Sequence, residues 1–167
     1  MALDSGGMLQ RTVFYTDTAT IYCVGKLDSG VADVSVSSTV RASSLYVSDR
    51  DAYVPVDEIV AVSSADQTPG MGQSIVAFQL DKAVPDPSVD PSTVPFNPGT
   101  YVCDLYVNGD LDRSIPFTIA FPDCPVAPPG DGGPCAGWVR PGSRCPGAQA
   151  GVECTCASSG SWSCSSP

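Results

Sequence analysis

The stretch Asn97–Gly109, NPGTYVCDLYVNG, constrains the fold of this chain more than any other. It opens with the turn signal Pro98-Gly99 and closes with the hairpin signal Asn108-Gly109. Between the two turns, one face is apolar and the other is more polar, and alternation with period two predicts a half-buried strand. The apolar face carries Tyr101, Cys103, Leu105 and Val107, and the other face carries Val102, Asp104, Tyr106 and Asn108.

Other short β-type runs, separated by turn residues, lie on both sides of this strand. We predict them at 11–16, 19–27, 31–40, 45–47, 58–63 and 74–80, and in a last strand that turns Ile115, Phe117, Ile119 and Phe121 inward. Pro55 indicates an edge position, because proline donates no ladder hydrogen bond. No helix of ten or more residues is predicted. The spacing of strands and turns favours an all-β antiparallel sandwich.

The order Asn97-x-Gly99-x-Tyr101-x-Cys103 resembles the Asp-x-Gly-x-Tyr-x-Cys corner of immunoglobulin-like domains, with Asn in place of Asp. The resemblance covers residues 10–122 at the level of the fold. It implies that the Tyr101 hydroxyl folds back onto the preceding corner, and that an inter-sheet disulfide joins Cys23 to Cys103. The chain departs from the family because no tryptophan lies between these two cysteines and their separation is long.

Charge and composition change sharply near Cys124. Residues 1–123 hold 16 acidic and 6 basic residues, whereas residues 124–167 hold two of each. The second segment contains eight glycines and seven prolines, and a segment so poor in apolar periodicity needs covalent staples. We therefore expect a flexible lead at 1–9, an immunoglobulin-like sandwich at 10–122 and a small cysteine-rich disulfide module at 123–167.

Six cysteines lie in the tail with the spacing C-x10-C-x9-C-x8-C-x-C-x7-C, at positions Cys124, Cys135, Cys145, Cys154, Cys156 and Cys164. Spacing alone leaves 15 pairings open. The pattern resembles epidermal-growth-factor-like modules, and also the Cys-Pro…Cys-x-Cys…Trp-x-Cys tails of secreted or lipid-anchored bacterial proteins. The first resemblance implies the pairs Cys124–Cys145, Cys135–Cys154 and Cys156–Cys164. Zinc is a weaker alternative, because only one close cysteine pair is present.

An even cysteine count indicates an oxidising compartment, so we expect a secreted or cell-envelope-exposed protein. Because Met1–Gln10 lacks the features of a signal peptide, we expect that an export signal has been removed. No apolar run is long enough for a membrane span. The formal charge of -10 argues against nucleic acid and anionic membranes as partners.

Catalysis finds little support in the sequence, and we expect neither an enzyme nor a cofactor. The chain has no histidine, no Gly-x-Ser-x-Gly elbow and no phosphate-binding glycine loop. A hydrolase, or a hydrolase accessory domain, acting on extracellular polymer is the alternative. Its carboxylate pair would come from aspartates of the Asp49–Glu58 or Asp81–Asp90 segments.

Two weaker site candidates remain. Asp49, Asp51, Asp57 and Glu58 offer oxygen ligands for calcium, although they match no calcium-loop signature and solvated charge is the simpler interpretation. The tryptophans Trp138 and Trp162 are candidates for an exposed binding surface on the tail, with packing over disulfides as the alternative.

We therefore expect a non-enzymatic binding or structural module whose ligand is a protein or a carbohydrate. A further alternative is the subunit of an extracellular filament that self-assembles through strand edges. In that case Arg11–Tyr15 or Val54–Val62 would be the edge that pairs with another copy.

Overall fold

A computed structural model describes residues 1–27, 34–67, 75–82, 87–91, 94–122, 124, 129–135, 139–149 and 151–166, without the side chains of Ser48 and residues 61–67. The described regular structure is nearly all β, apart from one 3-10 turn at Ser48–Arg50. No described helix has the length and apolar content needed to cross a bilayer. The chain divides into a first unit, Met1–Phe14 with Thr18–Ala120, and a second unit, Tyr15–Asp17 with Phe121–Pro167.

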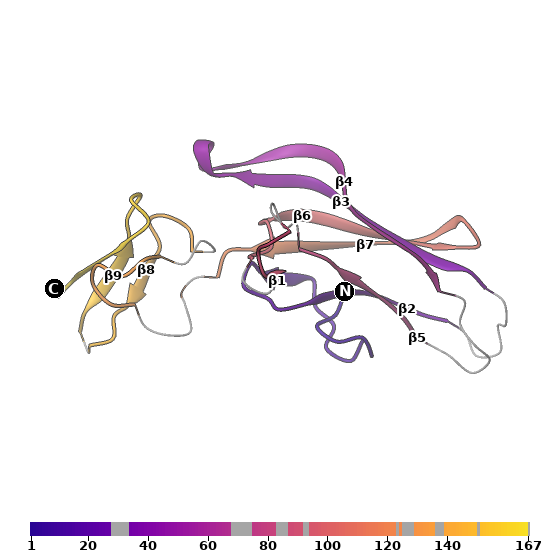
Figure 1. Cartoon of the computed structure of the whole chain (residues 1–167), viewed down its shortest axis with the longest axis horizontal. Coiled ribbons are helices and arrows are strands. Elements are labelled where there is room, and N and C mark those ends of the chain that lie inside the picture. The colour runs from indigo at the N-terminus through magenta and orange to yellow at the C-terminus, as the bar shows by residue number, and fades with distance from the viewer. Residues whose placement is uncertain are drawn as a thin grey trace. The chain divides into compact units, whose positions relative to one another are not determined.

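The first unit is built from a five-stranded and a two-stranded sheet. The larger sheet has the order β1-β7-β6-β3-β4, and the smaller one pairs β2 with β5 (Figure 1). Strand β2 pairs with β5, β3 pairs with β4 and β6, and β6 pairs with β7, and each of these pairings is antiparallel. The strands are β1 (Val13–Tyr15), β2 (Ile21–Lys26), β3 (Val36–Val47), β4 (Ala52–Gln67), β5 (Ile75–Leu80), β6 (Gly99–Val107) and β7 (Asp110–Ala120).

Strand β6 lies between β3 and β7. Its side chains alternate between the two faces of the sheet, as the Asn97–Gly109 stretch predicts. Tyr101, Cys103 and Leu105 are at most 5% exposed and face the core. The Asn108-Gly109 turn joins β6 to β7, and both residues have positive φ, as a tight hairpin requires. Core residues from both sheets pack on this face, among them Ile21, Val40, Val76, Phe78, Phe117 and Ile119.

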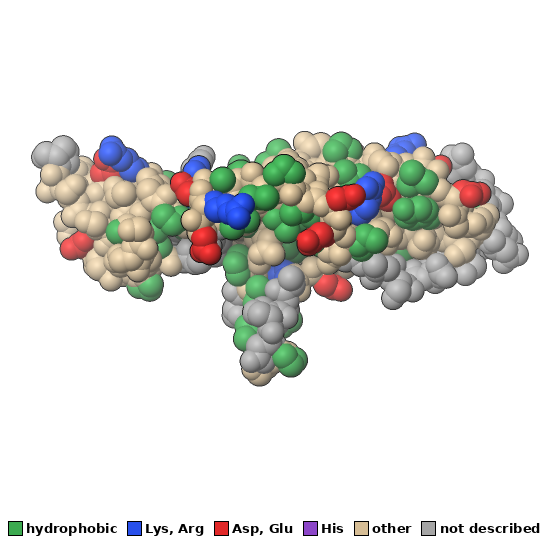
Figure 2. Space-filling view, turned by 90° about the horizontal axis from the view of Figure 1, so that it is seen from above, with side chains coloured by type: hydrophobic (Ala, Val, Ile, Leu, Met, Phe, Trp, Pro, Cys, Tyr) green, Lys and Arg blue, Asp and Glu red, His purple; other side chains and the backbone are tan. Residues whose placement is uncertain are grey.

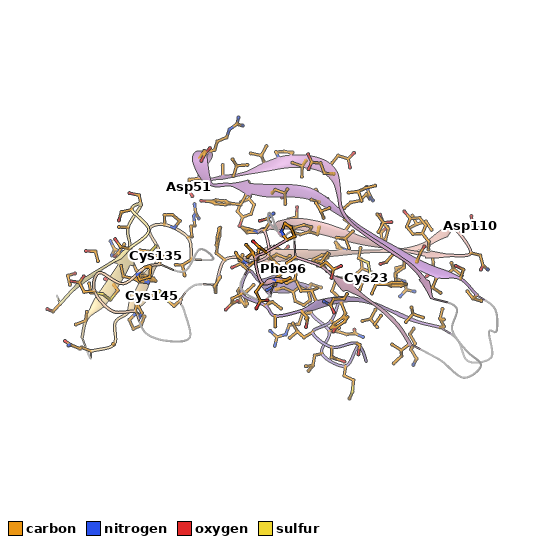
Figure 3. The ribbon with its side chains drawn as sticks, viewed as in Figure 1. Cys23, Asp51, Phe96, Asp110, Cys135 and Cys145 are labelled. Atoms are coloured by element: carbon orange, nitrogen blue, oxygen red, sulfur yellow. A yellow bond between two sulfur atoms is a disulfide. The ribbon has the colours of Figure 1, made fainter. Side chains whose placement is uncertain are left out.

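A disulfide joins Cys23 of β2 to Cys103 of β6, the pair that the resemblance implies. The bond links the two-stranded sheet to the five-stranded one, and both cysteines are at most 1% exposed. Figure 3 shows Cys23 in the interior of the first unit. Val40 of β3 pairs with Cys103 in the register, so a small aliphatic residue lies beside the bridge. The sequence has no tryptophan between the two cysteines that could take this place.

The hairpin of β3 and β4 is longer than the sequence predicts. Instead of separate short strands near 45–47 and 58–63, β3 runs on to Val47 and β4 is continuous from Ala52 to Gln67. Irregularities in the register near Val40 and Ala42 interrupt the pattern without ending the strands. Pro55 lies within β4, which forms one edge of the sheet and therefore tolerates a missing backbone donor.

The lead at 1–9, which the sequence predicts as flexible, is anchored to the first unit at its first residues. Met1 and Ala2 are buried. The Ala2 amide donates to the Tyr22 carbonyl, and the Tyr22 amide donates to the Ala2 carbonyl, each over 2.9 Å. The Asp4 carboxylate accepts hydrogen bonds from the backbone amides of Met8 and Leu9, which closes the turn that follows. Local sequence patterns could not predict the pairing of Ala2, because its partner Tyr22 of β2 lies 20 residues further along the chain.

The second unit is held by a small sheet and three disulfides. Its sheet has the order β10-β9-β8, from β8 (Arg144–Pro146), β9 (Glu153–Cys156) and β10 (Trp162–Ser165). Its core contains Val139, Trp162 and the sulfurs of Cys145, Cys154 and Cys156. Cysteine sulfur thus replaces the aliphatic side chains that this short segment lacks.

The disulfides of the second unit are Cys124–Cys145, Cys135–Cys156 and Cys154–Cys164. The first is the pair implied by the growth-factor resemblance, but the implied pairs Cys135–Cys154 and Cys156–Cys164 are wrong. The register explains the correction. Cys154 stands directly opposite Cys164, with a Cα–Cα distance of 4.0 Å, whereas Cys156 stands opposite Trp162.

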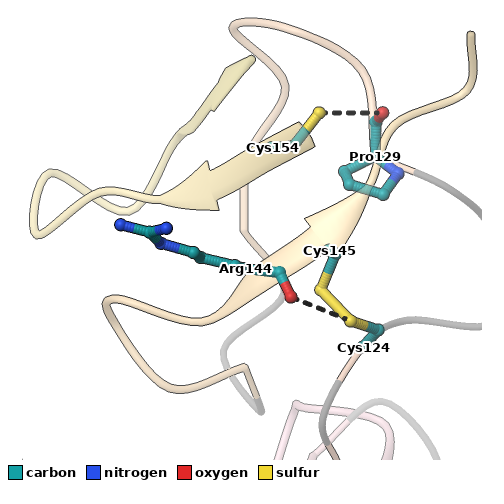
Figure 4. The surroundings of a disulfide bond; sticks show 5 residues. All are labelled: Cys124, Pro129, Arg144, Cys145 and Cys154. Atoms are coloured by element: carbon teal, nitrogen blue, oxygen red, sulfur yellow. Dashed lines mark hydrogen bonds between the residues drawn. A yellow bond between two sulfur atoms is a disulfide. The ribbon is translucent and has the colours of Figure 1, made fainter. Parts of the chain in front are cut away.

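Two backbone carbonyls lie against these sulfurs (Figure 4). The Cys124 sulfur is 3.4 Å from the Arg144 oxygen, and the Cys154 sulfur is 3.6 Å from the Pro129 oxygen. A disulfide sulfur carries no hydrogen, so these are close contacts and not hydrogen bonds. Strand β8, at Arg144, therefore lies against the Cys124–Cys145 disulfide, and the backbone at Pro129 lies against the Cys154–Cys164 disulfide.

Candidate functional site

A cavity of about 290 Å³ in the first unit is the strongest candidate site. It lies where β3 and β4 continue past the start of β6, near the end of β5. Its floor consists of the buried residues Leu80, Phe96, Tyr101 and Ile119. Its mouth consists of exposed residues, which are Glu58, Ile59, Val60, Asp81 and Asn97. An apolar floor that opens through polar groups is the usual form of a ligand site.

The corner before β6 builds one wall of this cavity. The Tyr101 hydroxyl donates a 2.6 Å hydrogen bond to the Asn97 carbonyl, four residues upstream. Burial raises the pKa of Tyr101, so its hydroxyl stays protonated and remains a donor. The Tyr101 ring stacks on Phe117, with 5.3 Å between the ring centroids. This hydrogen bond and this stack hold the Asn97 backbone beside the cavity.

Gly99 is required in the same corner because the backbone approaches closely there. A Cβ atom at this position would overlap the Ser44 carbonyl oxygen of β3. Position 99 pairs with Leu45 just beyond the irregularity between Ala42 and Ser44. The glycine of the sequence motif therefore lets β3 bend away over the cavity.

We expect Tyr101→Phe to lower the free energy of unfolding of the first unit by about 1 kcal/mol, because one hydrogen bond is lost and the ring stays. Chemical denaturation of the full chain measures this change. Tyr106→Phe is the matched control, since that side chain lies on the opposite face of β6. Equal effects of the two substitutions would contradict a specific role for the corner.

One basic group lies beside the cavity floor. The Lys82 ammonium is 5.1 Å from the centroid of the Phe96 ring, which is a cation–π distance. Figure 3 places Phe96 in the interior of the first unit. Lys82 thus lies over the buried Phe96 ring, whereas the carboxylates Glu58 and Asp81 line the mouth, where both are exposed.

The two acidic segments singled out in the sequence meet in part at this cavity. Glu58 comes from Asp49–Glu58 and Asp81 from Asp81–Asp90, and both line it. The remaining calcium candidates lie elsewhere on β4 and its turn. Asp51 accepts a 2.6 Å hydrogen bond from the Tyr46 hydroxyl at the hairpin tip, and Asp57 lies 3.9 Å from Arg41 (Figure 3). Among the described residues, no three carboxylate or cysteine side chains form a metal-binding group.

Trp162 does not contribute to an exposed tryptophan surface. Trp162 is 5% exposed and packs among the cysteines of the second unit, because the segment has few other large apolar side chains. The alternative of packing over disulfides therefore holds for Trp162. Trp138 lies outside the described residues.

A larger cavity, of about 450 Å³, lies over β8 and β9 of the second unit. It lacks a broad apolar floor, because Cys145 is the only fully buried residue among the described residues that line it. Its two charged residues, Arg144 and Glu153, are 3.9 Å apart and largely exposed, so they compensate one another. The first-unit cavity is therefore the better candidate.

Both strand edges named in the sequence lie at the ends of the five-stranded sheet. Arg11–Tyr15 contains β1, and Val54–Val62 lies within β4. On β4, Ile59 is 61% exposed and Val60 is 41% exposed. Pro55 indicated this edge in the sequence, but the cavity beneath it was missed, because it depends on residues from five strands and from the loop before β6.

Comparison of the chain with protein-family models, with curated proteins and with solved structures finds no match.

Proposed function

We propose that this chain is a secreted or envelope-exposed, non-enzymatic binding or structural module. The observation that carries the proposal is the complete pairing of the eight cysteines in four disulfides. Such a density of disulfides is typical of proteins that work in an oxidising environment outside the cytosol. The second unit in particular has too small an apolar core to fold without them.

We further propose that the first unit is an immunoglobulin-like sandwich. Three features support this: the strand order β1-β7-β6-β3-β4 opposite β2-β5, the bridge from β2 to β6, and the tyrosine corner at Tyr101. Such sandwiches serve unrelated functions, so the fold alone does not assign one. The binding role rests on the apolar cavity with its exposed mouth.

The distribution of charge on the surface favours a partner other than nucleic acid. Figure 2 shows hydrophobic, acidic and basic side chains interspersed on the described part of the face that it presents. A nucleic-acid interface would need a continuous basic field.

Alkylation of the native, metal-free protein tests this proposal. We expect no mass increase before reduction and the mass of eight alkyl groups after reduction and unfolding, because every cysteine is bonded. Intact-mass spectrometry reads both states. Eight reactive thiols in the native protein would overturn the assignment to an oxidising compartment.

A hydrolase remains the second candidate, because Glu58 and Asp81 line one cavity. Polysaccharide hydrolysis needs two such carboxylates, one of which acts as an acid in apolar surroundings. Both residues are exposed here, which favours binding over catalysis. Release of reducing ends from a polysaccharide, lost in Glu58→Gln and in Asp81→Asn, would favour the hydrolase instead.

A further inference from the structure

Strand β4 combines a free edge with an entrance to the apolar cavity. Within the described residues, β3 is the only strand that pairs with β4, so the opposite edge of β4 has no strand beside it. Next to this edge, Ile59 and Val60 are exposed and line the cavity mouth. A free strand edge offers backbone donors and acceptors to an extended peptide, and an adjacent pocket supplies side-chain specificity.

The cavity has the size and chemistry for one large apolar side chain. An engineered apolar cavity of about 150 Å³ holds benzene. The present cavity of about 290 Å³ has Phe96, Tyr101 and Ile119 in its floor. An aromatic side chain fits this floor, whereas a charged or strongly hydrated group would lose its solvation there.

The charge at the mouth determines which kind of segment would enter. Glu58 on β4 and Asp81, directly after β5, are both exposed there. Lys82 is the nearby basic residue, and its ammonium lies over the Phe96 ring. The rim is therefore acidic, and residues 1–123 as a whole carry 16 acidic against 6 basic residues. A second copy would bring like charge to this rim, whereas a basic segment would be attracted.

We propose that the free edge of β4 binds an extended, basic segment of another protein, with one aromatic side chain in the cavity. This inference rests on the proposed binding function and names its partner class. The segment adds a strand beside Val56–Val60, beyond Pro55, which has no amide hydrogen to donate. Its lysine or arginine residues flank the aromatic anchor and lie near Glu58 and Asp81.

A synthetic peptide tests the proposal on the full chain. The probe is fluorescein-labelled Lys-Val-Lys-Phe-Lys-Val-Lys, and fluorescence anisotropy at low salt measures its dissociation constant. We expect micromolar binding that weakens about tenfold or more when the central Phe is replaced by Ala, because the cavity is then empty. A peptide with Glu in place of Lys should bind more weakly still.

Matched variants locate the site. Val60→Trp should fill the cavity mouth, and Glu58→Lys with Asp81→Lys should reverse its charge, so each should weaken binding about tenfold. Leu111→Trp and Asp110→Lys are the controls, because both residues lie at the β6–β7 turn of the same unit. Figure 3 shows Asp110 at the opposite end of that unit from Asp51. Circular dichroism melts verify that every variant folds.

Three results would overturn the inference. They are absence of binding at millimolar peptide, equal binding of the Phe and Ala peptides, and equal effects of the site and control variants. A concentration-dependent dimer that Ile59→Lys abolishes would also overturn it, because the occupant would then be a second copy. If peptide binding fails while all cysteines resist alkylation, the inference falls and the proposed function stands.

Discussion

Replacing Cys23 and Cys103 together by alanine should lower the free energy of unfolding of the first unit by about 4–5 kcal/mol. The two cysteines are separated by 80 residues, and the bond removes much of the chain entropy of the unfolded state. Both side chains are also buried, so the variant loses packing at the centre of the core. Among the described strands, the two sheets share no backbone pairing, and the disulfide links them covalently.

Thermal and denaturant unfolding of the full chain measure this loss. The control is Cys124→Ala with Cys145→Ala, which opens a bridge of sequence separation 21 in the second unit. That pair should cost the second unit about 3 kcal/mol and leave the transition of the first unit in place. An unchanged first-unit midpoint in the Cys23/Cys103 variant would contradict the prediction. So would peptide mapping that joins either cysteine to the second unit.

Asp104→Ala should lower the free energy of unfolding by about 1–3 kcal/mol at neutral pH. Asp104 is 1% exposed, although it lies on the face of β6 opposite the core. Its carboxylate accepts hydrogen bonds from Arg41 Nε over 2.8 Å and from the Ser114 hydroxyl over 2.5 Å. Without the carboxylate, the Ser114 hydroxyl loses its acceptor.

The pKa of the Asp104 carboxyl predicts how the stability loss in Asp104→Ala depends on pH. Burial raises the pKa of Asp104, but the hydrogen bonds from Arg41 and Ser114 and the Arg41 charge outweigh it and hold that pKa below the ordinary 3.8. The carboxylate therefore stabilises the folded state above pH 3.8, and this contribution is lost as the pH falls through the lowered pKa. Urea unfolding at neutral and acidic pH measures the difference between wild type and variant, which should shrink in acid.

Asp57→Ala is the control for this prediction. Asp57 also approaches Arg41, but its side chain is 93% exposed and the N–O distance is 3.9 Å. Solvent and salt screen such a pair, so the variant should unfold almost as the wild type does. A loss at Asp57 as large as that at Asp104, or a loss at Asp104 that persists unchanged in acid, would contradict the argument.

The sequence predicts the central strands well because local patterns determine them. Alternation places Tyr101, Cys103 and Leu105 on the buried face of β6, and Asn108-Gly109 supplies the positive φ values of its turn. The resemblance of Asn97-x-Gly99-x-Tyr101 to the immunoglobulin-like corner also implies the hydrogen bond of the corner, which joins residues only four apart. Glycine is required at position 99 because the Ser44 carbonyl oxygen would overlap any Cβ atom there.

Features that depend on distant partners could not be predicted in the same way. The burial of Ala2 depends on β2, and the pairing of Cys154 depends on the register of β9 with β10. The candidate cavity brings together residues as far apart as Leu45 and Ile119. Sequence analysis singled out Glu58 and Asp81 as parts of two acidic segments, but their common cavity arises only from the packing of the two sheets.

The bridge between β2 and β6 also determines how the first unit responds to a pulling force. Tension applied to residues before Cys23 and after Cys103 passes through the disulfide, and the 80-residue segment between them is not stretched. At about 3.4 Å per extended residue, roughly 270 Å of chain length is thus withheld from extension. The free edge of β4 and the cavity beside it belong to this shielded segment, apart from the β7 residue Ile119. If the flanking strands β1 and β7 were pulled away, a partner bound there would keep the edge of β4 and lose only the Ile119 part of the cavity floor.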